Sequence, residues 1–280
     1  MSRYKKLLKK KKNNQKAVLI TAYDYAAAKI IDDCDIDAVL MGDSAAMVAL
    51  GYESTIEISL DEIVMLGRAV RRGLTKPYYI VDMPFLSYQP SREEAIKNCG
   101  RVLKETKCDS VKMEGGSEYL DIIKAVIETG IPVCGHVGMT PQRHKVYNGY
   151  PVKGQSHEEA VRIIKDAIEL EKAGISMLII ENVPDRISSY ITENLKIPVY
   201  SIGCGTETDG QIIVYHDILE MFEGFKPRFV KIYGHISKNI KKAVSDYAGD
   251  VKHGKFPQKK SIPHLKETEK EKIRELFPDF

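Results

Sequence analysis

The chain contains a series of short apolar runs that each end in a charged or titratable residue. The clearest run covers 38–44 and reads Ala-Val-Leu-Met-Gly-Asp-Ser. Four further runs with the same design end at Asp82, Glu114, His136 and Glu181. A short apolar run bounded by turn residues is typical of a strand that is buried on both faces of a parallel sheet. This repetition constrains the fold more than any other feature of the sequence.

Eight segments fit this strand pattern, and segments with helical spacing separate most of them. The predicted strands cover 18–22, 38–42, 78–82, 110–114, 131–136, 177–181, 199–203 and 229–233. The predicted helices cover 25–33, 60–72, 91–105, 119–129, 156–173, 184–194 and 210–222. A last helix over 237–251 is expected to complete the ring of helices.

Strands that alternate with helices predict a parallel sheet joined by right-handed crossovers. Eight repeats favour closure into an α/β barrel, the (β/α)8 TIM barrel, over an open doubly wound sheet. An open sheet is also expected to carry a Gly-rich dinucleotide-binding loop after its first strand, where this chain reads Thr-Ala-Tyr-Asp-Tyr at 21–25. We therefore predict a single-domain catalytic barrel at 17–253, preceded by a basic segment at 1–16 and followed by a charged tail at 254–280.

The bulk composition is that of an ordinary globular protein, with 43% hydrophobic and 29% charged residues and a formal charge of +3. Much of the positive excess lies between Lys5 and Lys12, which we interpret as a solvated or frayed terminus, so we expect no nucleic-acid partner. No apolar stretch approaches the roughly 20 residues that span a bilayer, and no signal-peptide core follows the lysines. The five cysteines are irregularly spaced, which indicates reduced thiols. We expect a cytoplasmic protein with small-molecule substrates and no membrane partner.

The candidate functional residues lie where the predicted strands end, which is where (β/α)8 barrels place their active sites. Because side chains alternate along a strand, Val39, Met41 and Asp43 are expected to share the inward face. Together with Asp82 and Glu114, Asp43 would bring three carboxylates to one mouth, and hard oxygen ligands of this kind suit Mg²⁺. The alternative is that each acid caps a helix or pairs with a lysine.

The remaining candidates are two basic residues and one acid at the ends of predicted strands. Lys112 shares the face of Glu114, and a buried lysine needs a partner, either a substrate carboxylate or Glu114 in a purely structural pair. His136 is either a functional group or a hydrogen-bonded core histidine, and Cys134 is expected to pack in the core. Glu181 ends a strongly apolar strand, where loss of hydration makes a carboxylate a better proton acceptor and thus a candidate general base.

Seven strings of the sequence resemble those of the ketopantoate hydroxymethyltransferases, also called 3-methyl-2-oxobutanoate hydroxymethyltransferases. In chain order they are TAYD (21–24), GDS (42–44), GYEST (51–55), DMPF (82–85), VKMEGG (111–116), GHVGMTPQ (135–142) and DGQ (209–211). They occur in the family's order and with similar spacing over 21–233. The chain departs at Asn182, where the family often has Cys, at Ala45 and Ala46, where Leu-Gly is usual, and at Cys204, where Ala is common. None of these positions carries a group that is expected to react.

The resemblance implies an activity. It implies Mg²⁺-dependent transfer of a hydroxymethyl group from 5,10-methylenetetrahydrofolate, the co-substrate, to 3-methyl-2-oxobutanoate. The product is 2-dehydropantoate, a precursor of pantothenate and coenzyme A. The resemblance also implies a homo-oligomer, expected to be a decamer.

The resemblance further implies a role for each candidate residue. It implies one Mg²⁺ per subunit, held by Asp43, Asp82 and Glu114, with Glu114 bound directly or through water. It implies that the oxoacid site consists of Asp43, Ser44, Asp82, Lys112 and His136. Glu181 is implied as the general base.

Two other functions are compatible with the residues. Another Mg²⁺-dependent barrel enzyme acting on 2-oxoacids, such as a carbon–carbon lyase or a phosphoenolpyruvate mutase, would use the same metal chemistry. Cys134-Gly135-His136 is superficially similar to an element of those enzymes. Folate-dependent product formation distinguishes the two. A catalytically silent binding barrel would not need polar groups at five strand ends, and a divalent-ion binding measurement would reveal it.

Overall fold

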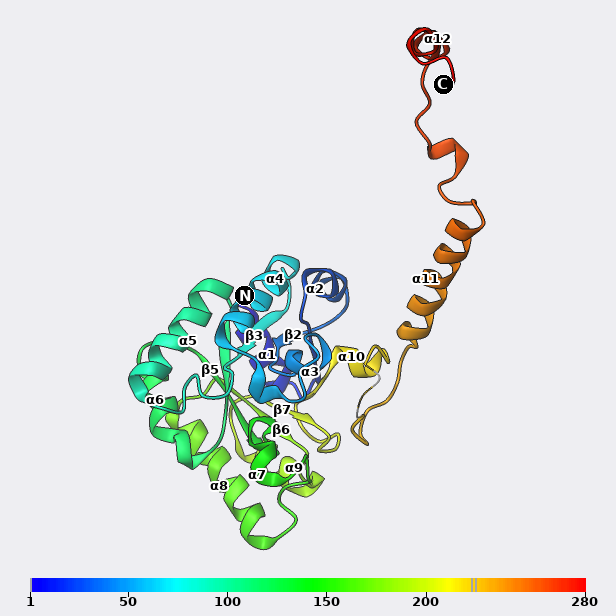
Figure 1. Cartoon of the computed structure of the whole chain (residues 1–280). Coiled ribbons are helices and arrows are strands. Elements are labelled where there is room, and N and C mark those ends of the chain that lie inside the picture. Colours follow the sequence, from blue (N-terminus) through cyan, green and yellow to red (C-terminus); the bar gives the residue numbers. More distant parts are fainter. Residues whose placement is uncertain (1, 223, 225) are drawn as a thin grey trace. The chain divides into compact units, whose positions relative to one another are not determined.

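The computed structural model describes residues 2–222, 224 and 226–280, and in this part of the chain eight parallel strands form a closed barrel (Figure 1). Each strand pairs with its neighbours in sequence order, and β8 pairs with β1 to close the ring. The strands are β1 (Ala17–Thr21), β2 (Ala38–Met41), β3 (Tyr78–Asp82), β4 (Ser110–Glu114), β5 (Val133–Gly138), β6 (Met177–Glu181), β7 (Val199–Ile202) and β8 (Gly210–Ile213). The predicted (β/α)8 barrel is confirmed.

Within 1–233, helices follow or precede most strands and cover the outside of the barrel (Figure 1). The longer helices of this part are α1 (Arg3–Lys12), α2 (Tyr25–Asp32), α4 (Leu60–Gly73), α5 (Arg92–Thr106), α6 (Leu120–Glu128), α8 (His157–Ala173) and α9 (Asp185–Asn194). Two further long helices, α11 (Ile236–Lys252) and α12 (Glu267–Leu276), follow in the rest of the chain. The short ones are α3 (Ala45–Val48), α7 (His144–Tyr147), α10 (Tyr215–Ile218) and four 3₁₀ turns, Thr55–Glu57, Ser117–Tyr119, Pro141–Arg143 and Lys259–Ser261. None of the helices in the described ranges has the length and apolar content needed to cross a bilayer.

The chain divides into two compact units, 1–233 and 234–280. The first unit contains all the barrel strands, and the second contains α11 and α12. The division falls before α11, whereas the sequence-based boundary at 253 assigned this helix to the barrel.

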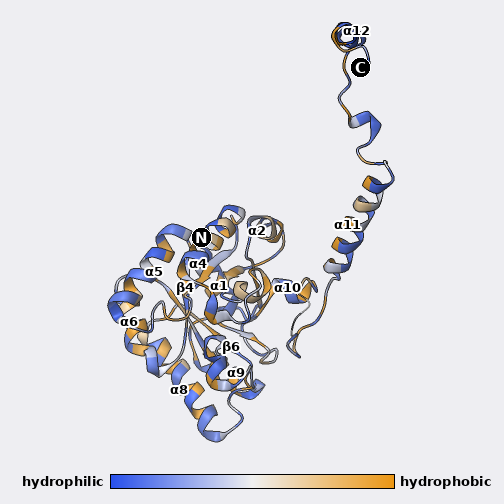
Figure 2. Cartoon of the chain, in the orientation of Figure 1, coloured by the Kyte–Doolittle hydropathy of each residue, from blue (hydrophilic) through white to orange (hydrophobic). Residues whose placement is uncertain are grey.

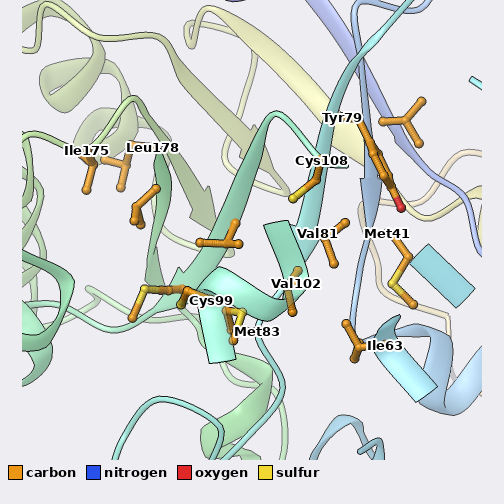
Figure 3. Close-up of a cluster of buried hydrophobic side chains, with 14 of the residues drawn as sticks. Met41, Ile63, Tyr79, Val81, Met83, Cys99, Val102, Cys108, Ile175 and Leu178 are labelled. Atoms are coloured by element: carbon orange, nitrogen blue, oxygen red, sulfur yellow. The ribbon is translucent and has the colours of Figure 1, made fainter. Parts of the chain in front are cut away.

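The strands separate two apolar layers, as expected when both faces of a parallel sheet are buried. Side chains such as Leu40 and Ile80 fill the barrel interior, together with residues of β5, β6 and β7. Their neighbours Val39 and Val81 point outward and pack against the helices. Figure 3 shows part of this outer layer, where Val81 lies near Val102 of α5. The helices that pack on the outer face of the strands carry both hydrophobic and hydrophilic residues, as Figure 2 shows for α5, α6 and α8.

The basic helix α1 closes the barrel at the amino ends of the strands. The expectation of a frayed terminus was wrong, whereas its lysines are exposed or partly exposed, as expected of a solvated face. Leu7 is only 2% exposed and belongs to the cluster that fills the barrel interior. Ion pairs join Lys10 to Asp37, Lys11 to Asp209 and Arg3 to Asp109, with N–O distances of 2.6, 2.7 and 3.3 Å. Partly exposed pairs contribute at most about 1 kcal/mol each, whereas burying a leucine contributes about 2–3 kcal/mol. Leu7 is therefore the main anchor.

The three aspartates that α1 contacts also fix neighbouring strands against each other. Each one directly precedes a strand and accepts a hydrogen bond from a backbone N–H of the strand before it. The pairs are Asp37 with Val18, Asp109 with Tyr79 and Asp209 with Val199, at 2.9, 2.9 and 2.8 Å. Because a slip of one residue would turn every side chain to the other face, these hydrogen bonds help to specify the register.

The prediction of the last strand was wrong. We predicted a helix over 210–222 and a strand over 229–233, but β8 is Gly210–Ile213 and 229–233 is not a strand. Ile212 faces the barrel interior and Ile213 packs outside, which is the two-residue alternation of a strand. The run is short and begins with Gly and Gln, so its apolar signal is weak. Strands β7 and β8 are joined without a helix.

We predict that Leu7→Ala lowers the free energy of unfolding by about 3 kcal/mol, because it leaves a cavity at the closed end of the barrel. Urea denaturation would measure the change. The control is Leu86→Ala, at a leucine that is 57% exposed, which should change stability by about 0.5 kcal/mol or less. Equal effects of the two substitutions would contradict the anchoring role of Leu7.

Candidate active site

The carboxyl ends of the strands surround a cavity of about 100 Å³. All seven residues predicted from the sequence line it: Asp43, Ser44, Asp82, Lys112, Glu114, His136 and Glu181. Asp82, Glu114 and Glu181 are the last residues of β3, β4 and β6, and His136 lies within β5. The predicted convergence on one mouth is therefore confirmed, whereas the roles of the residues stay predictions.

Asp43 reaches the mouth by a different route from the predicted one. Val39 and Met41 face the helices, so they do not share an inward face with Asp43. Strand β2 ends at Met41, and the alternation of faces no longer applies beyond it. Gly42 directly follows the strand, and a Cβ added there would lie 2.9 Å from Ser44 Oγ and 3.5 Å from Asp82 Oδ2. The glycine thus keeps space open beside these two groups.

Lys112 lies at the centre of the charged groups and is 4% exposed. Its ammonium nitrogen is 2.7 Å from Asp82 Oδ1 and 3.3 Å from both Glu114 Oε1 and His136 Nδ1. His136 Nδ1 also lies 3.2 Å from Glu114 Oε1. On its other side, His136 Nε2 is 3.3 Å from Glu181 Oε2, without the alignment of a hydrogen bond.

The charges of these groups shift one another. Burial alone would raise the pKa of Glu114, but the Lys112 ammonium and His136 outweigh it and lower this pKa to about 2. Burial and Lys112 lower the pKa of His136, but the nearby carboxylates of Glu114 and Glu181 outweigh them and raise it to about 9. Burial likewise disfavours the charged form of Lys112, yet Asp82, Glu114 and Asp43 raise its pKa. Glu114 is thus a firmly ionised partner of two basic groups.

Asp43 and Asp82 are less well compensated. Burial and the negative charges of Asp82 and Glu114 raise the pKa of Asp43 well above its usual range. Burial also raises the pKa of Asp82, although Lys112 acts in the opposite direction. The backbone N–H of Asp43 donates to Asp82 Oδ2 at 3.1 Å, so the two acids are neighbours. Further positive charge beside them would stabilise both carboxylates.

The donor set fits a divalent cation in its chemistry, because among the described residues around the cavity four carboxyl groups face only two basic side chains. In residues 2–222, 224 and 226–280, no three or more His, Cys, Asp or Glu side chains are already placed as the ligands of one metal. Glu114 Oε1 contacts both Lys112 and His136. Glu114 Oε2 accepts a hydrogen bond from the backbone N–H of Gln142, with an N–O distance of 3.1 Å. Asp43 and Asp82 are therefore the better candidates for direct contact.

Gln142 is a site residue that the sequence analysis missed. It lies in the turn after β5 and is 4% exposed. Its side-chain amide donates to Asp43 Oδ2 and to the carbonyl oxygen of Met83, both at 2.9 Å. Its Oε1 lies 3.3 Å from the hydroxyl of Tyr88, which also bonds the backbone of Glu114. The only sequence signal was its position at the end of GHVGMTPQ.

Two other assignments follow from the packing around the mouth. Cys134 is buried in the barrel interior, which confirms that it is a core residue, and burial raises the pKa of its thiol. We did not predict Tyr23 as a site residue. Its hydroxyl oxygen lies 2.8 Å from Ser44 Oγ. This contact orients the Ser44 hydroxyl at the edge of the cavity.

A second, larger cavity of about 460 Å³ adjoins the first and shares Ser44, Pro141, Glu181 and Val214 with it. Its walls are mostly apolar and come from the loops after β2, β5 and β8. The mouth therefore combines a small charged cavity with a larger apolar one, and Glu181 lines both.

Comparisons with known proteins point to one family. The family model described as ketopantoate hydroxymethyltransferase matches residues 2–259. The 3-methyl-2-oxobutanoate hydroxymethyltransferase of Caldicellulosiruptor bescii is 45% identical over 255 residues, covering 91% of this chain and 96% of the relative. The enzyme of the same name from Clostridium botulinum (strain 657 / Type Ba4) is 42% identical over 267 residues, covering 95% of this chain and 96% of the relative.

Solved structures with a similar fold are much less similar in sequence. A phosphonopyruvate hydrolase in complex with oxalate and Mg²⁺ has a TM-score of 0.58 at 13% identity, covering 100% of this chain and 99% of the other. An oxaloacetate acetylhydrolase in complex with its product oxalate has a TM-score of 0.60 at 11% identity, covering 99% and 98%. At these identities the likeness shows the fold alone.

We predict that Gln142→Leu lowers the free energy of unfolding by about 3 kcal/mol, because the buried Asp43 carboxylate and the Met83 carbonyl each lose a donor. Urea denaturation would measure the loss. The control is Gln211→Leu, which removes amide hydrogen bonds to Ser201, Gly205 and Thr208 away from the mouth. Gln211 is exposed, so we expect a loss of about 1 kcal/mol or less. Losses of equal size would show that Gln142 has no special role at the mouth.

Proposed function

Because the chain belongs to the ketopantoate hydroxymethyltransferase family, we propose that it transfers a hydroxymethyl group from 5,10-methylenetetrahydrofolate to 3-methyl-2-oxobutanoate. The product is 2-dehydropantoate, and the other product is tetrahydrofolate. The observation that carries this proposal is the pair of adjoining cavities that share Glu181, one small and charged, the other larger and apolar. Two reactants of different size and polarity need such a pair.

We propose that the oxoacid binds in the small cavity. Its carboxylate is an anion, and Lys112 is a buried cation in that cavity. Ser44 supplies a hydroxyl that Tyr23 orients, and His136 lies between Glu114 and Glu181. Charge-assisted hydrogen bonds of this kind are stronger than neutral ones, so they would fix the orientation of the oxoacid.

We propose that Asp43 and Asp82 hold Mg²⁺, with Glu114 contributing through water. The high pKa of Asp43 supports this assignment, because it reports negative charge that the chain leaves uncompensated. When bound there, Mg²⁺ would draw electron density from the adjacent ketone and make the C3–H of the oxoacid more acidic. Gln142 would keep Asp43 in place through the hydrogen bond to Oδ2.

Glu181 is proposed as the base that removes the C3 proton. Among the acids that the structure describes, it alone lines both cavities, and it forms no hydrogen bond with His136. The carbanion at C3 forms a bond to the one-carbon unit, whose two bonds to folate nitrogens N5 and N10 both break in the course of the reaction. Water supplies the hydroxyl group that replaces the second nitrogen. The proton removed from C3 and the second proton of water end on the two nitrogens of tetrahydrofolate. Holding the two reactants side by side contributes several kcal/mol to such a step.

The lyase or mutase alternative has less support. The hydrolases of similar fold share only 11–13% identity with the chain, whereas the hydroxymethyltransferases share 42–45% over nine-tenths or more of it. As further proposals from the family resemblance, we retain a cytoplasmic location and a homo-oligomer, a decamer.

The decisive experiment combines the protein with Mg²⁺, 3-methyl-2-oxobutanoate and 5,10-methylenetetrahydrofolate and detects 2-dehydropantoate by mass spectrometry. We expect product only when all three are present, and none after chelation with EDTA. Asp82→Asn should weaken Mg²⁺ binding by at least about tenfold, because an amide is a poorer ligand for a hard cation. Cleavage of an oxoacid without folate would instead support the lyase alternative.

We predict that Glu181→Gln lowers the exchange of the C3 deuterium of the oxoacid with water by about 100-fold, the usual scale of general-base catalysis. This exchange needs no folate and can be followed by NMR. Binding of the oxoacid should persist, since Glu181 is not among the groups proposed to bind it. Glu207→Gln, at an exposed position, is the matched control and should exchange normally. Exchange that survived in Glu181→Gln and vanished in His136→Ala would identify His136 as the base.

A further inference from the structure

Asp217 is a buried carboxylate that the proposed reaction does not use. It lies in α10, directly after β8, and is 7% exposed. It lines the larger cavity together with apolar side chains such as Met47, Phe222 and Phe229. An acid in an apolar wall costs free energy unless something compensates it.

In the part of the chain that the structure describes, the Asp217 carboxylate accepts no hydrogen bond and forms no ion pair. The positive charge of Lys226 acts on Asp217, but its ammonium is bound to Glu220 at 2.8 Å. Burial raises the pKa of Asp217 to about 6 against the opposing effect of Lys226. A buried polar group without a partner calls for an explanation, and a ligand in the cavity is one.

A second polar group lies in the same cavity wall. Thr55 is 3% exposed, and its hydroxyl oxygen makes no hydrogen bond to any residue that the structure describes. Asp217 and Thr55 thus provide hydrogen-bonding groups for a ligand in a mostly apolar cavity, whose other polar lining residues include Tyr150, Asn182 and Arg228. The same cavity reaches Ser44 and Glu181. A ligand that fills it would therefore have a polar, hydrogen-bonding part and a part that faces the base.

We infer that Asp217 binds the pterin ring of the folate co-substrate, through the ring N3–H and the 2-amino group. This inference rests on the proposed function. The two pterin groups are neighbouring donors, and a carboxylate offers two acceptor oxygens side by side, which allows a bidentate contact. Phe222 and Phe229 supply aromatic surface for the flat ring. Asp217 is accordingly a specificity-determining residue for the one-carbon donor.

Asp217→Asn tests the inference, because it replaces one acceptor oxygen of the carboxylate with an NH₂ group. This donor would face the donors of the pterin ring. We expect the Kd for tetrahydrofolate, measured by calorimetry, and the KM for 5,10-methylenetetrahydrofolate to rise about 10–100-fold, the scale of a lost hydrogen bond to a charged group. Folate-independent exchange of the C3 deuterium should stay unchanged. Asp61→Asn is the control, since this acid is 80% exposed and pairs with Arg101 on the outside.

An analogue provides a test that does not depend on the folding of a variant. Wild-type enzyme should bind 2-desamino-2-methyltetrahydrofolate at least about tenfold more weakly than tetrahydrofolate, and Asp217→Asn should lose most of this discrimination. Equal binding of both compounds by the wild type would overturn the inference, even if 2-dehydropantoate forms as proposed. A variant that loses folate binding and deuterium exchange together, with a lower Tm, would assign Asp217 a structural role instead. Absence of 2-dehydropantoate with the wild type would overturn the proposed function itself.

Discussion

The burial of the Lys112 ammonium governs the arrangement of the barrel mouth. A charge that is removed from water must be compensated by partners of opposite charge, and a single partner rarely suffices. Asp82 and Glu114 supply these partners from the ends of two neighbouring strands. Glu114 in turn orients His136, and Gln142 joins Glu114 to Asp43. The order of the mouth therefore depends on one cation that is held between strands.

The mouth works as two compartments with one shared wall. The small cavity concentrates charge in little space, while the larger one is mostly apolar. Glu181 lies between them because β6 ends there, so its position is set by the sheet and not by a flexible loop. A proton acceptor on a rigid element keeps its distance from both reactants constant, which is the requirement for efficient transfer between them.

Local sequence patterns predicted the parts of the fold in which the local signal is strong. The strands at Tyr78–Asp82, Ser110–Glu114 and Met177–Glu181 were predicted with their observed bounds, because a short, mainly apolar run ends there in a charged residue. Strand β8 was missed because Gly210 and Gln211 dilute its apolar pattern. Its identity depends on pairing with β1 and β7, which no local pattern contains.

The same limit applies to the site. The strand-end residues were found because each one interrupts an apolar run. Gln142 and Asp217 lie in turns and short helices, where polar residues are common and carry no signal. Their importance comes from distant partners, such as the Asp43 carboxylate for Gln142, or from the cavity that they line. Asp43 lines the mouth as predicted, but the reason given for its position was wrong, since it lies beyond the strand whose alternation was used.

The aspartates at the closed end of the barrel have a consequence for how such a protein can diverge. They and α1 fix the strand register at the amino ends of the strands, opposite to the residues at the mouth. Register decides which side chains of β4 face inward, so Lys112 and Glu114 keep their places even when the loops above them change in length or composition. The loops at the open end can therefore change by mutation while the strand register is kept. A barrel whose closed end is fixed in this way could acquire new substrates by loop replacement alone, with its charged residues in their original positions.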